Sequence, residues 1–182
     1  MRGAGLWSRT APPPSIGRRT SPFKRQVAQR LKQIAAQIEA VNIECRSLIA
    51  AEVGLACRFD ILTSIPGLGE ATAFAIIADM PELGTLANKQ AVSLAGLAPV
   101  DRQSGKWKGR SFIRGGRAWL RQALYMPALV AIRFNQPLKA KYEAPRAAGN
   151  PAKLAITAIM RKLVVLANAL IRDNRKWSSQ LP

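Results

Sequence analysis

Hydrophobic residues recur at alternating spacings of four and three in the N-terminal third of the chain, which is typical of a coiled-coil helix. The series consists of Val27, Leu31, Ile34, Ile38, Val41, Cys45 and Leu48. Ser21 is placed to cap this helix, with Pro22 at its first position. We therefore predict a long coiled-coil-type helix over residues 23–55. Its apolar side pairs either with another copy of the chain or with a second helix of the same chain, and the pattern fits both.

A turn rich in glycine follows this helix. The sequence Ile65-Pro66-Gly67-Leu68-Gly69 lies between two apolar segments, the second of which covers residues 71–80. Such a turn between two short helices predicts a helix-hairpin-helix over about residues 58–80. In that motif the backbone amides near Gly67 and Gly69 face a nucleic-acid phosphate. A plain helix–helix turn is the alternative, because proline and glycine suit it equally well.

The rest of the pattern predicts a compact helical domain around one basic segment. Residues 99–116 contain four glycines and alternate basic with apolar positions, which predicts a loop or a β-hairpin. Further helices are expected over residues 89–94, 117–134, 138–147 and 152–172. Asn88 and Asn150 are the expected caps, Pro127 is expected to kink its helix, and Leu120, Leu124 and Ala128 are expected to be packed. The last helix is apolar on nearly all sides and should be central to the core. The predicted fold class is therefore mostly α.

The charge of the chain indicates the kind of partner that it binds. The chain has 28 lysines and arginines against 10 acidic residues, a formal net charge of +18. No acidic residue occurs between positions 102 and 142. The positive residues of that interval are Arg102, Lys106, Lys108, Arg110, Arg114, Arg117, Arg121, Arg133, Lys139 and Lys141. A surface of one sign repels itself unless a polyanion covers it, so DNA or RNA is the expected partner. Residues 1–22 are expected to be a disordered basic tail, and residues 178–182 a short C-terminal tail.

Several classes of chemistry are excluded by composition. The chain has no histidine, so it cannot build a Ser-His-Asp triad or a histidine-ligated metal site. Its ten carboxylates are scattered, so no metal site is expected within it. The start of the chain lacks the apolar run of a signal peptide. Residues 152–171 are apolar but interrupted by charges, which favours a buried helix over a membrane span. We expect a bacterial cytoplasmic, nucleoid-associated protein with no membrane contact.

An ordered series of short motifs carries a resemblance to a known family. The motifs begin with Ile65-Pro66-Gly67-Leu68-Gly69, Leu94-Ala95-Gly96-Leu97-Ala98-Pro99 and Ser104-Gly105 before Lys106-Trp107-Lys108-Gly109. They continue with Gly115-Gly116-Arg117, Ala131-Ile132-Arg133-Phe134-Asn135, Met160-Arg161-Lys162-Leu163, Arg172-Asp173 and Trp177. Over about residues 23–177 the chain resembles the C-terminal transposase domain of the IS110 family of insertion-sequence serine transposases. Each motif alone is weak, and the ordered series is specific.

The resemblance implies a two-part enzyme of DNA transposition and recombination. In that family an N-terminal RNase-H-like domain holds Mg²⁺ on an acidic cluster, a coiled coil follows, and a C-terminal domain supplies a nucleophilic serine. Its members act as oligomers with a structured guide RNA. Carried over to this sequence, Ser104 is the nucleophile and residues 56–177 are the transposase domain. The expected nucleic-acid-binding residues are Gly67, Gly69, Arg102, Lys106, Trp107, Lys108, Arg110, Arg114, Arg117 and Arg121.

One departure from the family pattern governs the expected activity. Nothing before Ser21 resembles the acidic domain, which predicts a truncated copy or one half of a split gene, inactive alone. Mg²⁺ is expected only with that missing domain, and the chain itself is expected to carry no cofactor. A homo-oligomer, or association with a full-length transposase, is the expected assembly. The alternative function is a non-catalytic basic DNA- or RNA-binding module. A small ribosomal-type protein is disfavoured by the coiled-coil pattern and the motif series.

Overall fold

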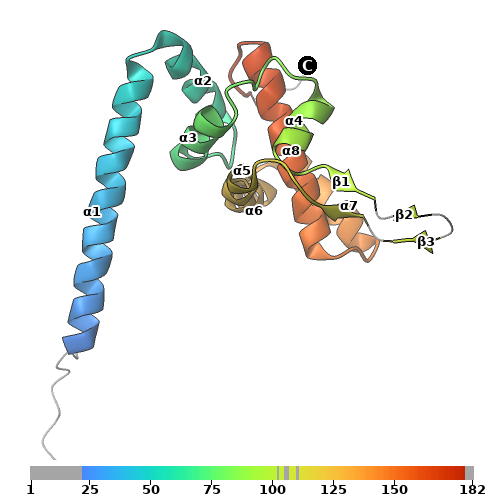
Figure 1. Cartoon of the computed structure of the whole chain (residues 1–182), viewed down its shortest axis with the longest axis horizontal. Helices are drawn as coiled ribbons and strands as arrows, with labels where there is room; N and C mark the ends of the chain where they lie inside the picture. Colours follow the sequence, from blue (N-terminus) through green and yellow to red (C-terminus); the bar gives the residue numbers. More distant parts are fainter. Residues whose placement is uncertain (1–21, 102, 105–106, 110, 179–182) are drawn as a thin grey trace, which may run out of the picture. The chain divides into compact units, whose positions relative to one another are not determined.

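The computed structural model describes residues 22–101, 103–104, 107–109 and 111–178, with the backbone alone at 103–104 and 107–108. Helices dominate the described chain, and the strands are four two-residue segments (Figure 1), so the predicted mostly α fold class is confirmed. The chain divides into two compact units, residues 1–41 and 42–182. Ser21, the predicted cap, lies outside the described residues. The two predicted tails also lie outside them, apart from Pro22 and Ser178.

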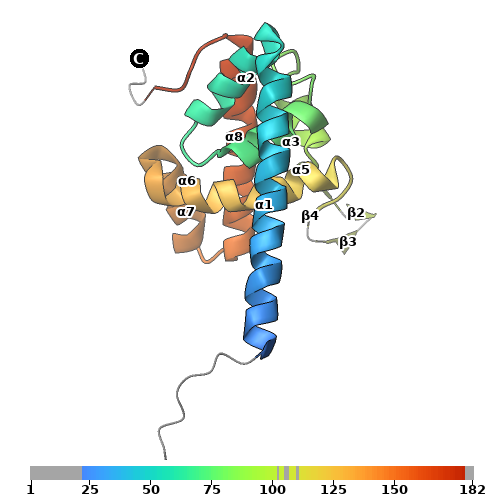
Figure 2. The same cartoon turned by 90° about the vertical axis from the view of Figure 1, so that its left-hand side faces the viewer.

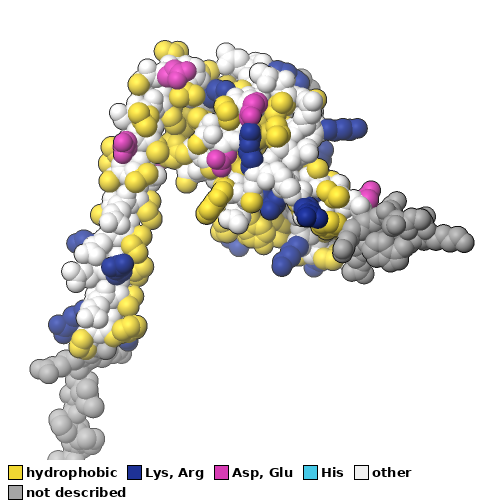
Figure 3. All heavy atoms as spheres, viewed as in Figure 1, with side chains coloured by type: hydrophobic (Ala, Val, Ile, Leu, Met, Phe, Trp, Pro, Cys, Tyr) yellow, Lys and Arg dark blue, Asp and Glu magenta, His cyan; other side chains and the backbone are white. Residues whose placement is uncertain are grey.

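The first unit is described by the N-terminal part of helix α1, which covers Pro22–Ala50. The predicted apolar series lies on this helix, and its side chains are exposed, from 42% at Val27 to 65% at Leu48, except for the partly buried Cys45. Figure 3 shows hydrophobic side chains along the length of α1. The helix ends at Ala50, before the predicted end at residue 55. Pairing of its apolar side stays a prediction.

Helix α8, Ala152–Arg172, is the central helix of the second unit. It packs against α2 (Val53–Ser64), α4 (Asn88–Leu94), α6 (Tyr125–Phe134) and α7 (Gln136–Ala147), and Figure 2 shows α6 and α7 against it. Its fully buried side chains include Ile159, Leu163 and Leu170, which confirms the predicted core helix. By length and composition it could cross a membrane, and half of that segment is buried inside the unit.

The predicted helix over residues 117–134 is two helices. Helix α5 covers Ala118–Ala123 and α6 begins at Tyr125, with the break at Leu124. Pro127 has no N–H to donate to the carbonyl four residues before it, and its ring crowds that carbonyl. The helix therefore breaks one turn before Pro127 instead of kinking at it. The predicted packed positions Leu120, Leu124 and Ala128 are fully buried.

Asparagines fix several element ends. Asn135 ends α6 and caps α7, because its side chain accepts a hydrogen bond from the Leu138 amide. The predictions that Asn88 caps α4 and that Asn150 caps α8 were wrong. Ala87 occupies the first of these positions, and its amide donates to the Gln90 side chain, while Pro151 occupies the second. The buried Asn168 of α8 instead bonds Asn88, and it also bonds the Gly84 amide and the Leu86 carbonyl at 2.8 Å each. Asn168 thereby holds the segment between α3 (Glu70–Asp79) and α4.

The basic segment forms an antiparallel β-hairpin. Strand β1 (Pro99–Val100) pairs with β4 (Phe112–Ile113), and β2 (Gln103–Ser104) pairs with β3 (Trp107–Lys108). Figure 1 shows the two ladders following one another away from α4. Of the two forms predicted for residues 99–116, the structure therefore has the hairpin.

Candidate nucleic-acid interface

The hairpin carries Ser104 at the end of its second ladder. Ser104 lies opposite Trp107, so two residues separate the paired positions. The predicted site residues Arg102, Lys106 and Arg110 lie outside the described residues. For Ser104, Trp107 and Lys108 the backbone alone is described. The β1–β4 ladder joins the helical unit, and Ser104 belongs to the second pair of the ladder that follows it.

Two motifs of the sequence meet at the root of this hairpin. Gly96 and Gly116 are in such close contact that a Cβ atom on Gly116 would lie 2.3 Å from the Gly96 Cα. The Arg117 amide donates to the Leu94 carbonyl at 2.8 Å. The Arg121 guanidinium donates to the carbonyls of Gly96 (3.1 Å) and Gly115 (3.0 Å). We call Gly96, Gly115, Gly116, Arg117 and Arg121 the hairpin clamp. It ties both ends of the hairpin to α4 and α5.

A bidentate ion pair extends the clamp to the segment before α4. Both terminal nitrogens of Arg117 donate to the Glu82 carboxylate, at 2.9 and 2.7 Å. Hydrogen bonding to Arg117 lowers the pKa of Glu82 to about 2, and the same contact raises the pKa of Arg117. This geometry is the strongest one available to an arginine and a carboxylate. Arg117 is therefore already engaged by an anionic partner within the chain.

Arg114, Arg117 and Arg121, all three expected to bind nucleic acid, differ in their surroundings. Arg117 is paired with Glu82, and Arg121 is bound to backbone carbonyls. Arg114 follows β4, is exposed, and makes no ion pair within the described part of the chain. Of the three, Arg114 is the cation whose charge is available to an external phosphate.

A cavity of about 400 Å³ lies at the root of the hairpin. It is lined by Leu97, Ile113, Arg121, Gln122, Tyr125, Lys153, Thr157 and Met160. Beside it, Nε of Arg161 donates to the Leu97 carbonyl at 2.6 Å, and burial lowers the pKa of Arg161. Sequence reasoning missed Lys153. The signal was present, because Lys153, Thr157 and Arg161 are spaced by four and share one side of a mostly apolar helix.

The predicted phosphate turn between α2 and α3 has two different glycines. Gly67 has a φ of +101°, and a Cβ there would lie 2.9 Å from backbone atoms of Pro127 and Ala131, so it allows α6 to pack closely. Gly69 has open space around it and its carbonyl accepts the amides of Thr72 and Ala73. The next residue, Glu70, is paired with Arg46 at 2.6 Å. A helix, a turn and a helix are thus present, and phosphate binding at Gly67 and Gly69 stays a prediction.

Carboxylates and cysteines do not gather in the described part of the chain. No group of three or more cysteine, aspartate or glutamate side chains there is placed to hold a metal ion. The described residues around the hairpin therefore offer a ligand cations and hydrogen-bond donors, and no cluster of metal ligands.

Comparison with known proteins identifies the region that carries these features. Residues 59–143 match the model of the Transposase IS116/IS110/IS902 family. This region belongs to the IS110 family of transposases. The match includes the α2–α3 turn, the hairpin and the whole clamp, and it confirms the family predicted from the motif series.

Curated relatives extend the similarity beyond that region. The pilin gene-inverting protein of Moraxella lacunata is 33% identical over 164 residues, covering 87% of this chain and 50% of the relative. That of Moraxella bovis is 34% identical over 128 residues, 68% of this chain and 40% of the relative. The insertion element IS116 uncharacterized 44.8 kDa protein of Streptomyces clavuligerus is 33% identical over 133 residues, which are 69% of this chain and 32% of the relative. The chain thus spans at most about half the length of these relatives.

Proposed function

We propose that this chain acts in DNA transposition or recombination by holding DNA against the hairpin and presenting Ser104 as a nucleophile. The observation that carries the proposal is the position of Ser104 near the end of a hairpin whose root is fixed by the family's own motif residues. A rigid hairpin root matters because a nucleophile reacts faster when it is held in the geometry required for attack.

The proposed reaction exchanges one phosphodiester for another. The Ser104 oxygen bonds to a DNA phosphorus atom while the bond from that phosphorus to one deoxyribose oxygen breaks. The serine proton passes to a carboxylate outside this chain, and the departing oxygen takes up a proton from water. The resulting phosphoserine ester keeps the energy of the broken bond, so a second DNA hydroxyl can attack it and release the serine. Cations around the hairpin would stabilise the charge gathered in the transition state.

The activating groups of this reaction must come from elsewhere. A serine hydroxyl is a weak nucleophile without an adjacent base or metal, and the chain contains no histidine. We propose that an acidic RNase-H-like domain outside residues 1–182 supplies carboxylates and Mg²⁺. We further propose that copies of the chain associate with one another or with a longer transposase through α1, and that a guide RNA shares the basic surface. Such a complex would act on DNA in the bacterial cytoplasm.

Trapping the covalent intermediate tests this proposal. The chain is mixed with target DNA, guide RNA and the acidic half of a relative, and SDS-resistant protein–DNA adducts are measured by electrophoresis. We expect an adduct that disappears in Ser104→Ala. Ser111→Ala is the matched control, because Ser111 lies on the same hairpin and its hydroxyl donates to Asp101. An adduct that persists in Ser104→Ala would refute the nucleophile.

A non-catalytic nucleic-acid-binding module is the second candidate. It is favoured by the excess of cations in a chain whose described residues contain no carboxylate cluster. It predicts salt-sensitive binding of DNA or RNA that is the same in Ser104→Ala and in the unmodified chain. Absence of any adduct together with such binding would favour this candidate.

A further inference from the structure

We propose that a cavity at the junction of α6 and α7 binds one unpaired nucleobase of a DNA or RNA strand. The cavity lies between this junction, α8 and the segment after α8, and we call it the C-terminal pocket. The proposal rests on the proposed function, because it assumes that the chain binds nucleic acid. It adds a second site, built from Trp177 and from residues of α7 and α8 away from the hairpin.

The size and the floor of the pocket suit a planar organic ring. Its volume is about 520 Å³, within the range of about 300–1,000 Å³ typical of small-ligand sites. The buried Leu138 and Leu170 and the partly buried Leu166 form an apolar floor. A flat heterocycle inserted here would remove apolar surface from water, as bases do when they leave a stack for a protein pocket.

Two aromatic side chains line the pocket from different elements. Phe134, at the end of α6, is 74% exposed although it is one of the larger apolar side chains. Trp177 is half-buried, and its amide donates to the Ser64 hydroxyl of α2 at 2.8 Å. Lys176 pairs with Asp60 at 2.9 Å, so the segment after α8 is anchored at the pocket-lining tryptophan and at the residue before it. Aromatic side chains held in this way are platforms on which single-stranded bases stack.

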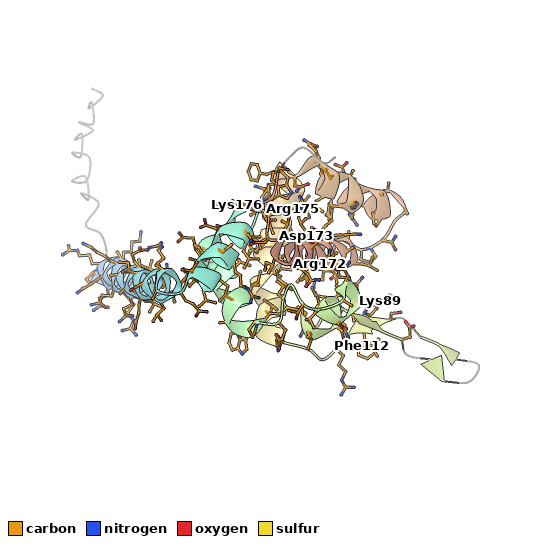
Figure 4. The ribbon with its side chains drawn as sticks, turned by 90° about the horizontal axis from the view of Figure 1, so that it is seen from above. Lys89, Phe112, Arg172, Asp173, Arg175 and Lys176 are labelled. Atoms are coloured by element: carbon orange, nitrogen blue, oxygen red, sulfur yellow. The ribbon has the colours of Figure 1, made fainter. Side chains whose placement is uncertain are left out.

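Charge decides between a nucleotide and an apolar ligand. Lys141, Lys162 and Arg175 line the pocket, and none of its described lining residues carries a carboxylate side chain. Within the described part of the chain Lys141 and Lys162 are in no ion pair, whereas Nε of Arg175 lies 3.7 Å from Asp173. Figure 4 shows Arg172, Asp173, Arg175 and Lys176 together at the end of α8. An uncharged apolar ligand gains nothing from these cations. A base flanked by two phosphates uses both the apolar floor and the charged rim.

The test compares two DNAs that differ in one base and in no phosphate. A 15-base-pair duplex with one bulged thymidine is titrated with the full chain by fluorescence anisotropy. The same duplex with an abasic nucleotide at the bulge is the reference. We expect about tenfold weaker binding of the abasic duplex, equivalent to about 1.4 kcal/mol. A 5-iodouracil at the bulge should cross-link to Trp177, which trypsin releases in the peptide following Lys176.

Variants locate the effect at the pocket. Lys141→Gln combined with Lys162→Gln should reduce affinity for the bulged thymidine, and Trp177→Phe should retain the preference that Trp177→Ala loses. Lys139→Gln is the control, because Lys139 lies on the same helix as Lys141 but outside the pocket. Melting temperatures followed by circular dichroism show whether each variant folds.

The outcomes separate this inference from the proposed function. Equal, salt-sensitive binding of both duplexes would overturn the pocket and leave nucleic-acid binding intact. Failure to bind either duplex would overturn both. Prevention of the cross-link by an acidic, aromatic peptide but not by thymidine monophosphate, each added before irradiation, would also overturn the inference, because the occupant would then be a protein.

Discussion

Gly116 has a neighbour that leaves no space for a side chain. Its φ is +62°, and a Cβ there would lie 2.3 Å from the backbone of Gly96. A left-handed backbone conformation alone costs a residue with a side chain roughly 1–2 kcal/mol. We predict that Gly116→Ala lowers the free energy of unfolding by more than this cost. The hairpin root would have to separate from α4 to relieve the overlap. Urea unfolding followed by circular dichroism measures the change.

Gly115 is the matched control for this prediction. It also has a positive φ, +77°, but nothing lies within 4 Å of the position of its Cβ. Gly115→Ala should therefore cost only the backbone term, and the difference between the two variants measures the Gly96–Gly116 contact. Equal losses in the two variants would show that the close contact contributes nothing to stability.

Elements far apart in sequence are joined by the Glu82–Arg117 pair, which makes part of the stability depend on pH. Folding lowers the pKa of Glu82 from 4.5 to about 2, so the unfolded chain binds more protons between these values. The stabilisation is complete above about pH 4.5 and is lost as the pH falls toward 2. We predict that Glu82→Gln melts at a lower temperature at pH 6, and that its melting temperature falls less on acidification than that of the unmodified chain.

The reciprocal variant checks the cause. Arg117→Gln removes the hydrogen bonds that lower the pKa of Glu82, so it should flatten the same acid limb. Melting curves between pH 6 and pH 2 measure all three proteins. Parallel curves for the unmodified chain and Glu82→Gln would contradict the assignment of this pH dependence to the pair.

Helix α1 carries the prediction that concerns assembly. Leu31 and Ile38 are 62% and 56% exposed, and burying such a stripe against a second helix is the driving force of a coiled coil. We predict that Leu31→Glu combined with Ile38→Glu converts an oligomer to a monomer, measured as mass by sedimentation. Gln29→Glu combined with Gln33→Glu adds the same charge off the apolar series and should leave the mass unchanged. A monomeric unmodified chain would refute assembly through α1.

The sequence predicted elements best where local rules act alone. The bounds of α8 were predicted without error, because its apolar run is bounded by Pro151 and by the polar residues after Arg172. The kink predicted at Pro127 is instead a break at Leu124, because proline acts on the carbonyl of the preceding turn. The partners of Arg117 and Arg121 were not predictable. Glu82 lies 35 residues before Arg117, and only the packing of α3 against α5 brings the two segments together.

At the scale of the whole molecule, a net charge of +18 is informative about the class of partner and not about individual contacts. Arg117, which belongs to a family motif, was predicted from the sequence to bind nucleic acid, and no role was assigned to Gly96 or Trp177. In the structure the Gly96 and Gly115-Gly116-Arg117 motifs build the clamp, and Trp177 lines a separate pocket. A motif retained for its place in the fold looks the same in a sequence as one retained for ligand contact.

Salt dependence distinguishes cations that bind nucleic acid from those that hold the fold. Each phosphate neutralised by a cation adds about 0.9 to the slope of log affinity against log salt. Arg114 is exposed and unpaired within the described part of the chain, so Arg114→Gln should reduce the slope by about 1. Arg117 is occupied by Glu82, so Arg117→Gln combined with Glu82→Gln, which removes both charges, should leave the slope unchanged.

Titrations of one duplex at several salt concentrations measure all three slopes under the same conditions. The double variant is required because Arg117→Gln alone would leave the Glu82 carboxylate facing the DNA and would weaken binding for a different reason. A slope lowered equally by the double variant and by Arg114→Gln would mean that Arg117 leaves Glu82 to bind phosphate. The clamp would then open when DNA binds, because the hairpin root and the DNA would compete for the same guanidinium.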